Sequence, residues 1–136
     1  MSATNPPLPV APVWNANSAA LLGRFLRDVV GTRLKARVLA LFLSHGGLCL
    51  SSQSLAERLG EAAPAVQRAA RELGEAGALH YCPQFGGADL CSLSLAYVSP
   101  TRRRELETLR LALRHQPELV WQRFEDAAPL AEGADR

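Results

Sequence analysis

The fold is decided by residues 51–77, which read SSQSLAERLGEAAPAVQRAARELGEAG. Apolar spacing in this stretch predicts two short amphipathic helices, over residues 53–59 and 64–75. Gly60 ends the first helix, as glycine does at helix C-termini. Pro64 fits the first turn of the second helix, because its missing N–H would have no partner there. Two short helices at so tight a turn predict a helix-turn-helix.

The flanking sequence completes a pattern that is mostly α with a small β-sheet (α+β). Helices are indicated by apolar residues at 3.6-residue spacing, and strands by alternation of apolar and polar residues. We expect helices over 18–29 and 34–44, a short strand at 48–50, strands over 78–82 and 90–98, and a helix from 100 onward that Pro117 kinks or restarts. Gly86-Gly87 suits a two-residue hairpin turn between the last two strands.

Residues 34–98 resemble the winged helix-turn-helix of bacterial transcription regulators, in the broad MarR-like and ArsR-like sense. The resemblance rests on SLAERLG (54–60), PAVQRAAREL (64–73) and EAGAL (75–79). It implies a winged helix-turn-helix with extra N- and C-terminal helices. It also implies that the helix over 64–75 enters the DNA major groove, with the hairpin beside it as a wing.

The chain has 136 residues, which is enough for one domain. We expect a flexible Pro-rich arm over 1–16, a winged-helix domain with flanking helices over 17–125, and a flexible acidic tail over 126–136. Hydrophobic residues make up 48% of the chain and charged residues 21%, so a packed core is expected. The net charge is only +2, which excludes a polycation.

Several classes of protein are disfavoured. No apolar run approaches the ~20 residues that cross a membrane, and the start lacks the pattern of a secretory signal, so we expect a cytoplasmic protein. No phosphate-binding Gly-rich loop, G-x-S-x-G or H-E-x-x-H motif is present. The expectation is therefore a protein without catalytic residues, cofactor or metal that is not an enzyme.

The resemblance points to a set of DNA-contacting side chains. Gln67 can pair with adenine and Arg68 with guanine, while Arg71 lies one turn later and is placed to reach a phosphate. The first amides of the preceding helix can hold another phosphate. The candidate DNA-binding residues in these two helices are Ser52, Gln53, Ala65, Gln67, Arg68 and Arg71. The alternative is that they form only the solvated face of an amphipathic helix.

Two features depart from the family pattern and one adds charge. Ala62 stands where a Ser or Thr usually caps the recognition helix, and the expected wing over 83–89 has no basic residue. The densest basic run is Arg102-Arg103-Arg104, which can meet the DNA backbone, an acidic partner, or Glu105 and Glu107 of a neighbour. The departures favour, as the alternative function, a winged-helix module that binds protein.

The terminal helices carry more apolar residues than a minimal winged-helix core needs. In MarR-like proteins such helices pair in a symmetric dimer, which matches two DNA half-sites ~34 Å apart. The candidate dimerisation residues are Leu22, Phe25, Leu106, Leu109, Leu113 and Trp121. The alternative is that these residues pack on their own domain.

The cysteines suggest a third and weaker hypothesis for the function, besides a DNA-binding regulator and a protein-binding module. It is a thiol- or metal-responsive repressor. With a turn at Gly86-Gly87, Cys82 and Cys91 are expected directly opposite each other, close enough for a disulfide or a shared metal. Pro83 works against this pairing, since it lacks a ladder N–H and favours a bulge that shifts the register. Isolated cysteines are more commonly small buried apolar residues.

Overall fold

The computed structural model describes Trp14 and residues 16–127. Its elements are α1 (Ala16–Phe25), the π-helix η1 (Leu26–Val30), α2 (Arg33–Ser44), β1 (Cys49–Leu50), α3 (Ser52–Leu59), α4 (Ala63–Glu75), β2 (His80–Phe85), β3 (Ala88–Ser92), the 3-10 helix η2 (Leu95–Tyr97), α5 (Pro100–His115) and α6 (Pro117–Ala127). The predicted α+β class, mostly helical with a small sheet, is confirmed. The predicted arm and tail lie almost wholly outside the described residues.

The helix boundaries follow from local signals. The Thr32 hydroxyl accepts a hydrogen bond from the Lys35 N–H at the start of α2, and Ser51 does the same for Ser54 in α3. Ser99 caps α5 by accepting from the Arg102 N–H. Each cap satisfies one of the N–H groups that a helix leaves unpaired at its start, so these helices begin close to where the sequence predicts them.

The three strands form one antiparallel sheet in the order β1-β3-β2. The predicted turn at Gly86-Gly87 is confirmed, with φ of 65° and 94° at the two glycines. The expected strand over 90–98 is too long, because β3 ends at Ser92 and residues 95–97 form η2. Pairing stops there because β2 begins opposite Ser92 and neither neighbouring strand continues beyond it.

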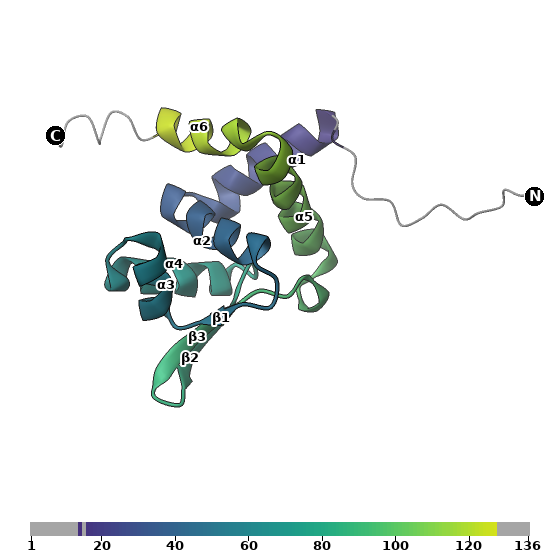
Figure 1. The fold of residues 1–136 in the computed structure, drawn as a ribbon. Helices are drawn as coiled ribbons and strands as arrows, with labels where there is room; N and C mark the ends of the chain where they lie inside the picture. The colour runs from purple at the N-terminus through teal and green to yellow at the C-terminus, as the bar shows by residue number, and fades with distance from the viewer. Residues whose placement is uncertain (1–13, 15, 128–136) are drawn as a thin grey trace, which may run out of the picture.

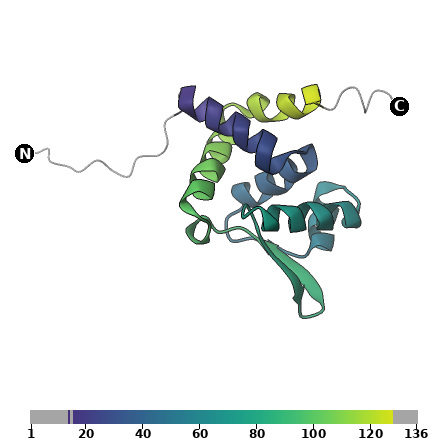
Figure 2. The ribbon, with the colours of Figure 1, turned by 180° about the vertical axis from the view of Figure 1, so that it is seen from behind.

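The helices stack in order from the sheet outward. Figures 1 and 2 show the hairpin projecting from one end and α1 and α6 covering the other, with α2 and α5 between them. A single apolar core runs through these layers, from Val66 and Leu73 of α4 through Leu39 of α2 to Leu106 and Leu109 of α5. Among the described residues, no helix is long and apolar enough to span a membrane.

Close contacts attach α4 to both of its neighbours. A Cβ placed on Gly74 would lie 2.8 Å from the Tyr81 Cβ, so α4 approaches β2 as closely as a glycine allows. On its other side, Lys35 of α2 forms an ion pair with Glu72 at 2.7 Å. Arg37 donates to the Leu59 carbonyl at the end of α3. The α3–α4 pair is thus held in a defined position against α2 and the sheet.

Candidate nucleic-acid interface

The turn between α3 and α4 is compact. Gly60 ends α3 in the left-handed conformation at φ 70°, and α4 begins three residues later. Ala62 precedes α4 without a side-chain cap, as the sequence predicts. Leu55 of α3 and Val66 of α4 are both fully buried in the same core. Both helices thus bury one face in this core, and the outward side of α4 is left to solvent.

The structure brings four of the candidate residues together on that outward side. Ala65, Gln67, Arg68 and Arg71 are all exposed, whereas the residues between them face the core. Arg68 and Arg71 form no ion pair with any other described side chain. The face therefore offers two guanidinium groups without ion-pair partners among the described residues, next to the Gln67 amide, which interacts with the Tyr81 hydroxyl. This is the chemistry that reads base edges and phosphates.

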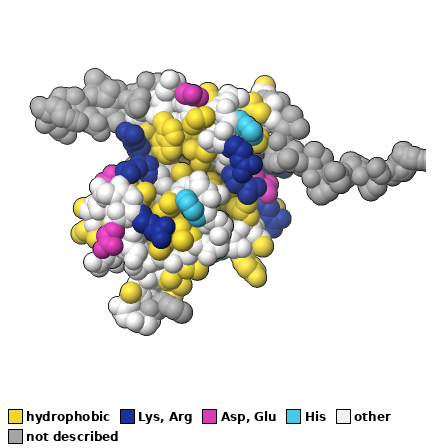
Figure 3. Space-filling view, viewed as in Figure 1, with side chains coloured by type: hydrophobic (Ala, Val, Ile, Leu, Met, Phe, Trp, Pro, Cys, Tyr) yellow, Lys and Arg dark blue, Asp and Glu magenta, His cyan; other side chains and the backbone are white. Residues whose placement is uncertain are grey.

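The charge around this face is nearly balanced. Residues 51–77 contain three arginines and four glutamates. Two of those glutamates, Glu61 and Glu72, are neutralised by ion pairs with Arg37 and Lys35 of α2. On the side of the molecule that Figure 3 shows, basic side chains lie in separate groups rather than in one continuous field, and residues 80–92 of the hairpin contain no Lys or Arg. Any electrostatic attraction to DNA must come from a few exposed arginines.

A buried carboxylate joins the hairpin to the start of α3. Asp89 of β3 is 9% exposed, and it accepts hydrogen bonds from the Ser52 N–H at 2.8 Å and from the Tyr81 hydroxyl at 3.0 Å. The Ser52 N–H, predicted as a phosphate donor, donates instead to the Asp89 carboxylate in this structure. Ser52 itself is 7% exposed. Gln53, the other candidate of α3, is exposed.

The protonation of this link is set by burial and hydrogen bonding. Burial disfavours the Asp89 anion, but hydrogen bonds from Ser52 and Tyr81 outweigh it and lower the pKa of Asp89. Burial raises the pKa of Tyr81; Gln67 opposes this shift and Asp89 adds to it. At neutral pH the link is an anionic carboxylate and a neutral phenol. The sequence holds a signal for the burial of Asp89. Side chains alternate between the two faces of a strand, so Asp89 shares the buried face of Cys91, two residues later.

The basic run at the start of α5 is not a single patch. Arg102 donates to the Ala76 carbonyl at 2.8 Å and to Glu105 at 2.6 Å, so its guanidinium stabilises the end of α4. Arg103 donates to the Leu95 carbonyl but is exposed. Arg104 is exposed and makes no ion pair with a described residue. Arg102 was predicted to contact the DNA backbone, but in this structure its side chain is bonded within the fold.

The candidate dimerisation residues divide into two groups. Leu22, Phe25, Leu106 and Leu109 are at most 3% exposed in the single chain, so they belong to its own core. Their burial agrees with the alternative that they pack on their own domain, and their role in a dimer stays a prediction. Of the predicted set, the half-buried Leu113 and Trp121 keep exposed surface.

The predicted cysteine pair is wrong. Cys91 lies opposite Tyr81, and Cys82 lies opposite Leu90, because β2 has one extra residue between Cys82 and Phe85. Pro83 lies in this bulge, where its missing N–H breaks the ladder. A one-residue shift moves the two thiols to opposite faces of the sheet. Burial raises the pKa of the Cys91 thiol to about 12.

The described residues also lack a cluster of possible metal ligands. Within the part of the chain that the structure describes, no three His, Cys, Asp or Glu side chains are grouped to hold a metal ion.

Comparisons with protein-family models, curated proteins and solved structures return no match for this chain.

Proposed function

We propose that this chain is a winged-helix DNA-binding protein, without enzymatic activity, that regulates transcription as a homodimer. The observation that carries the proposal is the exposed outward face of α4, where Gln67, Arg68 and Arg71 lie together without ion-pair partners among the described residues. Further support comes from the chain order of α2, β1, α3, α4, β2 and β3, in which a tight helix pair precedes a projecting hairpin.

In this proposal α4 enters the major groove, and its exposed side chains contact either base edges or phosphates. Arg68 donates two hydrogen bonds to guanine and Gln67 pairs with adenine, and each such pair contributes about 1–3 kcal/mol of discrimination. Arg71 binds a phosphate, which positions the helix but reads no sequence. Arg104 is available for a second backbone contact, because unlike Arg102 it is not engaged in the fold.

The dimer places two copies of α4 on successive turns of one face of DNA, ~34 Å apart. Leu22, Phe25, Leu106 and Leu109 are internal, so the interface would be built around Leu113 and Trp121. This assignment predicts a two-fold symmetric operator, since a closed dimer presents the same helix twice.

A second candidate, a winged-helix module that binds a protein, is favoured by one specific observation. The hairpin carries no Lys or Arg, and its acid Asp89 accepts a hydrogen bond from the Ser52 N–H at the start of α3. Phosphate contacts supply a large share of a DNA-binding protein's affinity, so their absence here suits a partner that is not a polyanion.

Fluorescence anisotropy on a random duplex of about 30 base pairs, across a salt series, distinguishes the two candidates. For a DNA-binding protein we expect affinity to fall steeply with salt, and Arg71→Ala to reduce the log–log slope by about 0.9 per protomer. Arg24→Ala is the matched control, because Arg24 is exposed on α1 at the opposite end from the hairpin.

Sequence selection then tests the assignment of Arg68. In an operator selected from random DNA, Arg68→Ala should cost about 1–3 kcal/mol and relax the preference at one base pair per half-site. Absence of binding to any duplex at about 50 mM salt would reject DNA binding and leave the protein-binding module. Binding with unchanged selectivity in Arg68→Ala would remove α4 from the groove.

A further inference from the structure

A groove of about 540 Å³ lies between η1 and α6, at the end of the molecule opposite the hairpin. Small-molecule sites in proteins usually measure about 300–1,000 Å³. Two almost fully buried side chains, Leu26 and Phe124, line it. Leu119 also lines the groove and is 41% exposed, so this leucine leaves apolar surface uncovered. An apolar ligand in the groove would cover it.

One wall of the groove has an unusual backbone. Residues 26–30 form a π-helix, which closes with a hydrogen bond of 2.8 Å from the Gly31 N–H to the Leu26 carbonyl. Gly31 then reverses the chain at φ 80°. Single π-helical turns are rare and occur frequently at functional sites. Here the turn places Leu26, Arg27 and Gly31 along the groove.

One arginine of the groove lies against α1. A Cβ built on Gly23 would lie 3.0 Å from the Nη2 atom of Arg123, so the guanidinium lies close to the backbone of α1. Arg123 is exposed and forms no ion pair with any described side chain. Its charge is available to a ligand.

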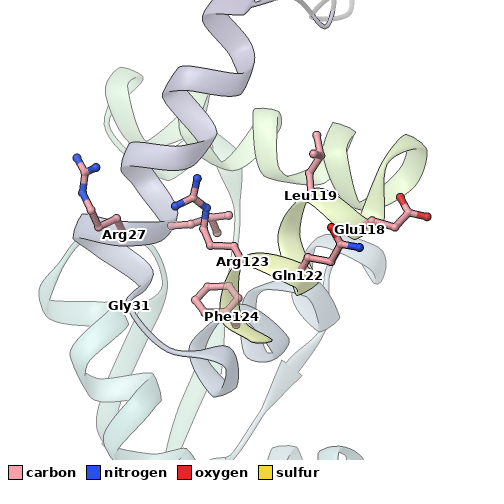
Figure 4. A pocket seen from close by; sticks show the side chains of 8 residues that line it. Arg27, Gly31, Glu118, Leu119, Gln122, Arg123 and Phe124 are labelled. Atoms are coloured by element: carbon pink, nitrogen blue, oxygen red, sulfur yellow. The ribbon is translucent and has the colours of Figure 1, made fainter. Parts of the chain in front are cut away.

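The groove carries one acid and two arginines. In Figure 4, Arg27 lies at one end, Glu118 and Gln122 lie at the other, and Arg123 lies between them. The Arg27 side chain already donates to its neighbour Asp28 at 2.9 Å, so Arg123 is the stronger candidate for an anion. A guanidinium matches the planar, two-oxygen geometry of a carboxylate. Glu118 repels a second negative charge at the far side.

We propose that this groove binds a small organic monocarboxylate with an apolar body. The carboxylate pairs with Arg123, whereas the charge of Arg27 is balanced by its ion pair with Asp28. The apolar body covers Leu119 and rests against Leu26 and Phe124. The site involves none of the α4 residues assigned to DNA, so it stands or falls independently of DNA binding.

Calorimetric titration of the full chain with phenylacetate and with hexanoate tests the site, and 2-phenylethanol serves as the neutral counterpart of phenylacetate. We expect saturable binding of a carboxylate and at least about tenfold weaker binding of the alcohol. Arg123→Ala should weaken carboxylate binding about tenfold or more, and Arg27→Ala should weaken it less. Arg110→Ala is the control, because Arg110 is exposed on α5 and does not line the groove.

Backbone amide shifts in nuclear magnetic resonance locate the bound carboxylate. The largest changes are expected at Arg27, Gly31 and residues 122–124. Three results would overturn the proposal: no binding of either carboxylate at about 10 mM, equal binding of the alcohol, or unchanged binding in Arg123→Ala. Circular dichroism of each variant separates a lost contact from a lost fold. Glu118→Gln should in addition improve binding of the dicarboxylate glutarate.

Discussion

Replacing Asp89 tests how the hairpin is attached to α3. The carboxylate is 9% exposed and accepts one hydrogen bond from the Ser52 N–H and one from the Tyr81 hydroxyl. Asp89→Asn keeps the size of the side chain but removes its charge and one of its two acceptor oxygens. Asp89→Ala removes both acceptors and leaves two donors in a poorly solvated place.

The magnitude follows from the two hydrogen bonds. A hydrogen bond to a charged group contributes about 1.5–3 kcal/mol, and an unsatisfied buried donor costs about 1–3 kcal/mol. We therefore expect Asp89→Ala to lower the free energy of unfolding by about 3–4 kcal/mol. Asp89→Asn should lower it by about 1–2 kcal/mol, since the amide oxygen still accepts one bond. Urea denaturation at pH 7 measures both values.

The pH dependence gives an independent check with a definite sign. The pKa of Asp89 is lowered in the folded protein: burial opposes the shift, and the hydrogen bonds from Ser52 and Tyr81 outweigh it. A lowered folded pKa means that the anion adds its full stability above the unfolded pKa of about 3.9. That stability is lost as the pH falls through the folded pKa. The difference between wild type and Asp89→Asn should accordingly be largest at neutral pH and shrink in acid.

Asp28→Asn is the matched control for this experiment. The pKa of Asp28 is also lowered, through its hydrogen bond with Arg27, but both side chains are more than half exposed. An exposed pair contributes little to stability, so this variant should unfold like the wild type. The reasoning would be refuted if Asp89→Asn left the unfolding free energy unchanged at pH 7, or if its difference from wild type did not vary with pH.

Further outcomes are expected elsewhere in the chain. Gly74→Ala should destabilise the protein by about 1–2 kcal/mol in urea despite the better helix propensity of alanine, because the added methyl group meets Tyr81 at 2.8 Å. Arg102→Met should lower stability by about 1–2 kcal/mol through its lost hydrogen bonds, whereas Arg104→Ala should leave the thermal midpoint unchanged. In thiol labelling at pH 8, Cys91 should react only on unfolding, since burial raises its pKa to about 12; prompt labelling of all three cysteines would contradict this.

Local signals in the sequence were sufficient for most of the elements. The spacing of Val66, Ala69, Ala70 and Leu73 predicts one face of α4, and the structure buries all four. The turn at Gly86-Gly87 was predictable because a two-residue hairpin turn needs positive φ, which glycine adopts without strain. Such features are decided within a few residues, without knowledge of the rest of the chain.

The candidate site was predictable only in part. The exposed residues of α4 follow from the helical period once its buried face is known, so Gln67, Arg68 and Arg71 were identified correctly as outward-facing. The use of Arg102 was not predictable, because its partner, the Ala76 carbonyl, lies 26 residues away. The approach of Arg123 to Gly23 joins residues far apart in the chain, so it depends on the tertiary arrangement of the helices.

By itself, then, the sequence determined the class of the fold, the order of its elements and the outward face of α4, because periodicity and capping act over short distances. Only the tertiary structure decided which apolar side chains are internal, as with Leu22 and Leu109, since the same amphipathic stripe can cover its own core or a second copy. It also decided the strand register, where a single bulged residue moved Cys82 and Cys91 to opposite faces. Burial and register depend on partners far along the chain, and those partners are brought together only by folding.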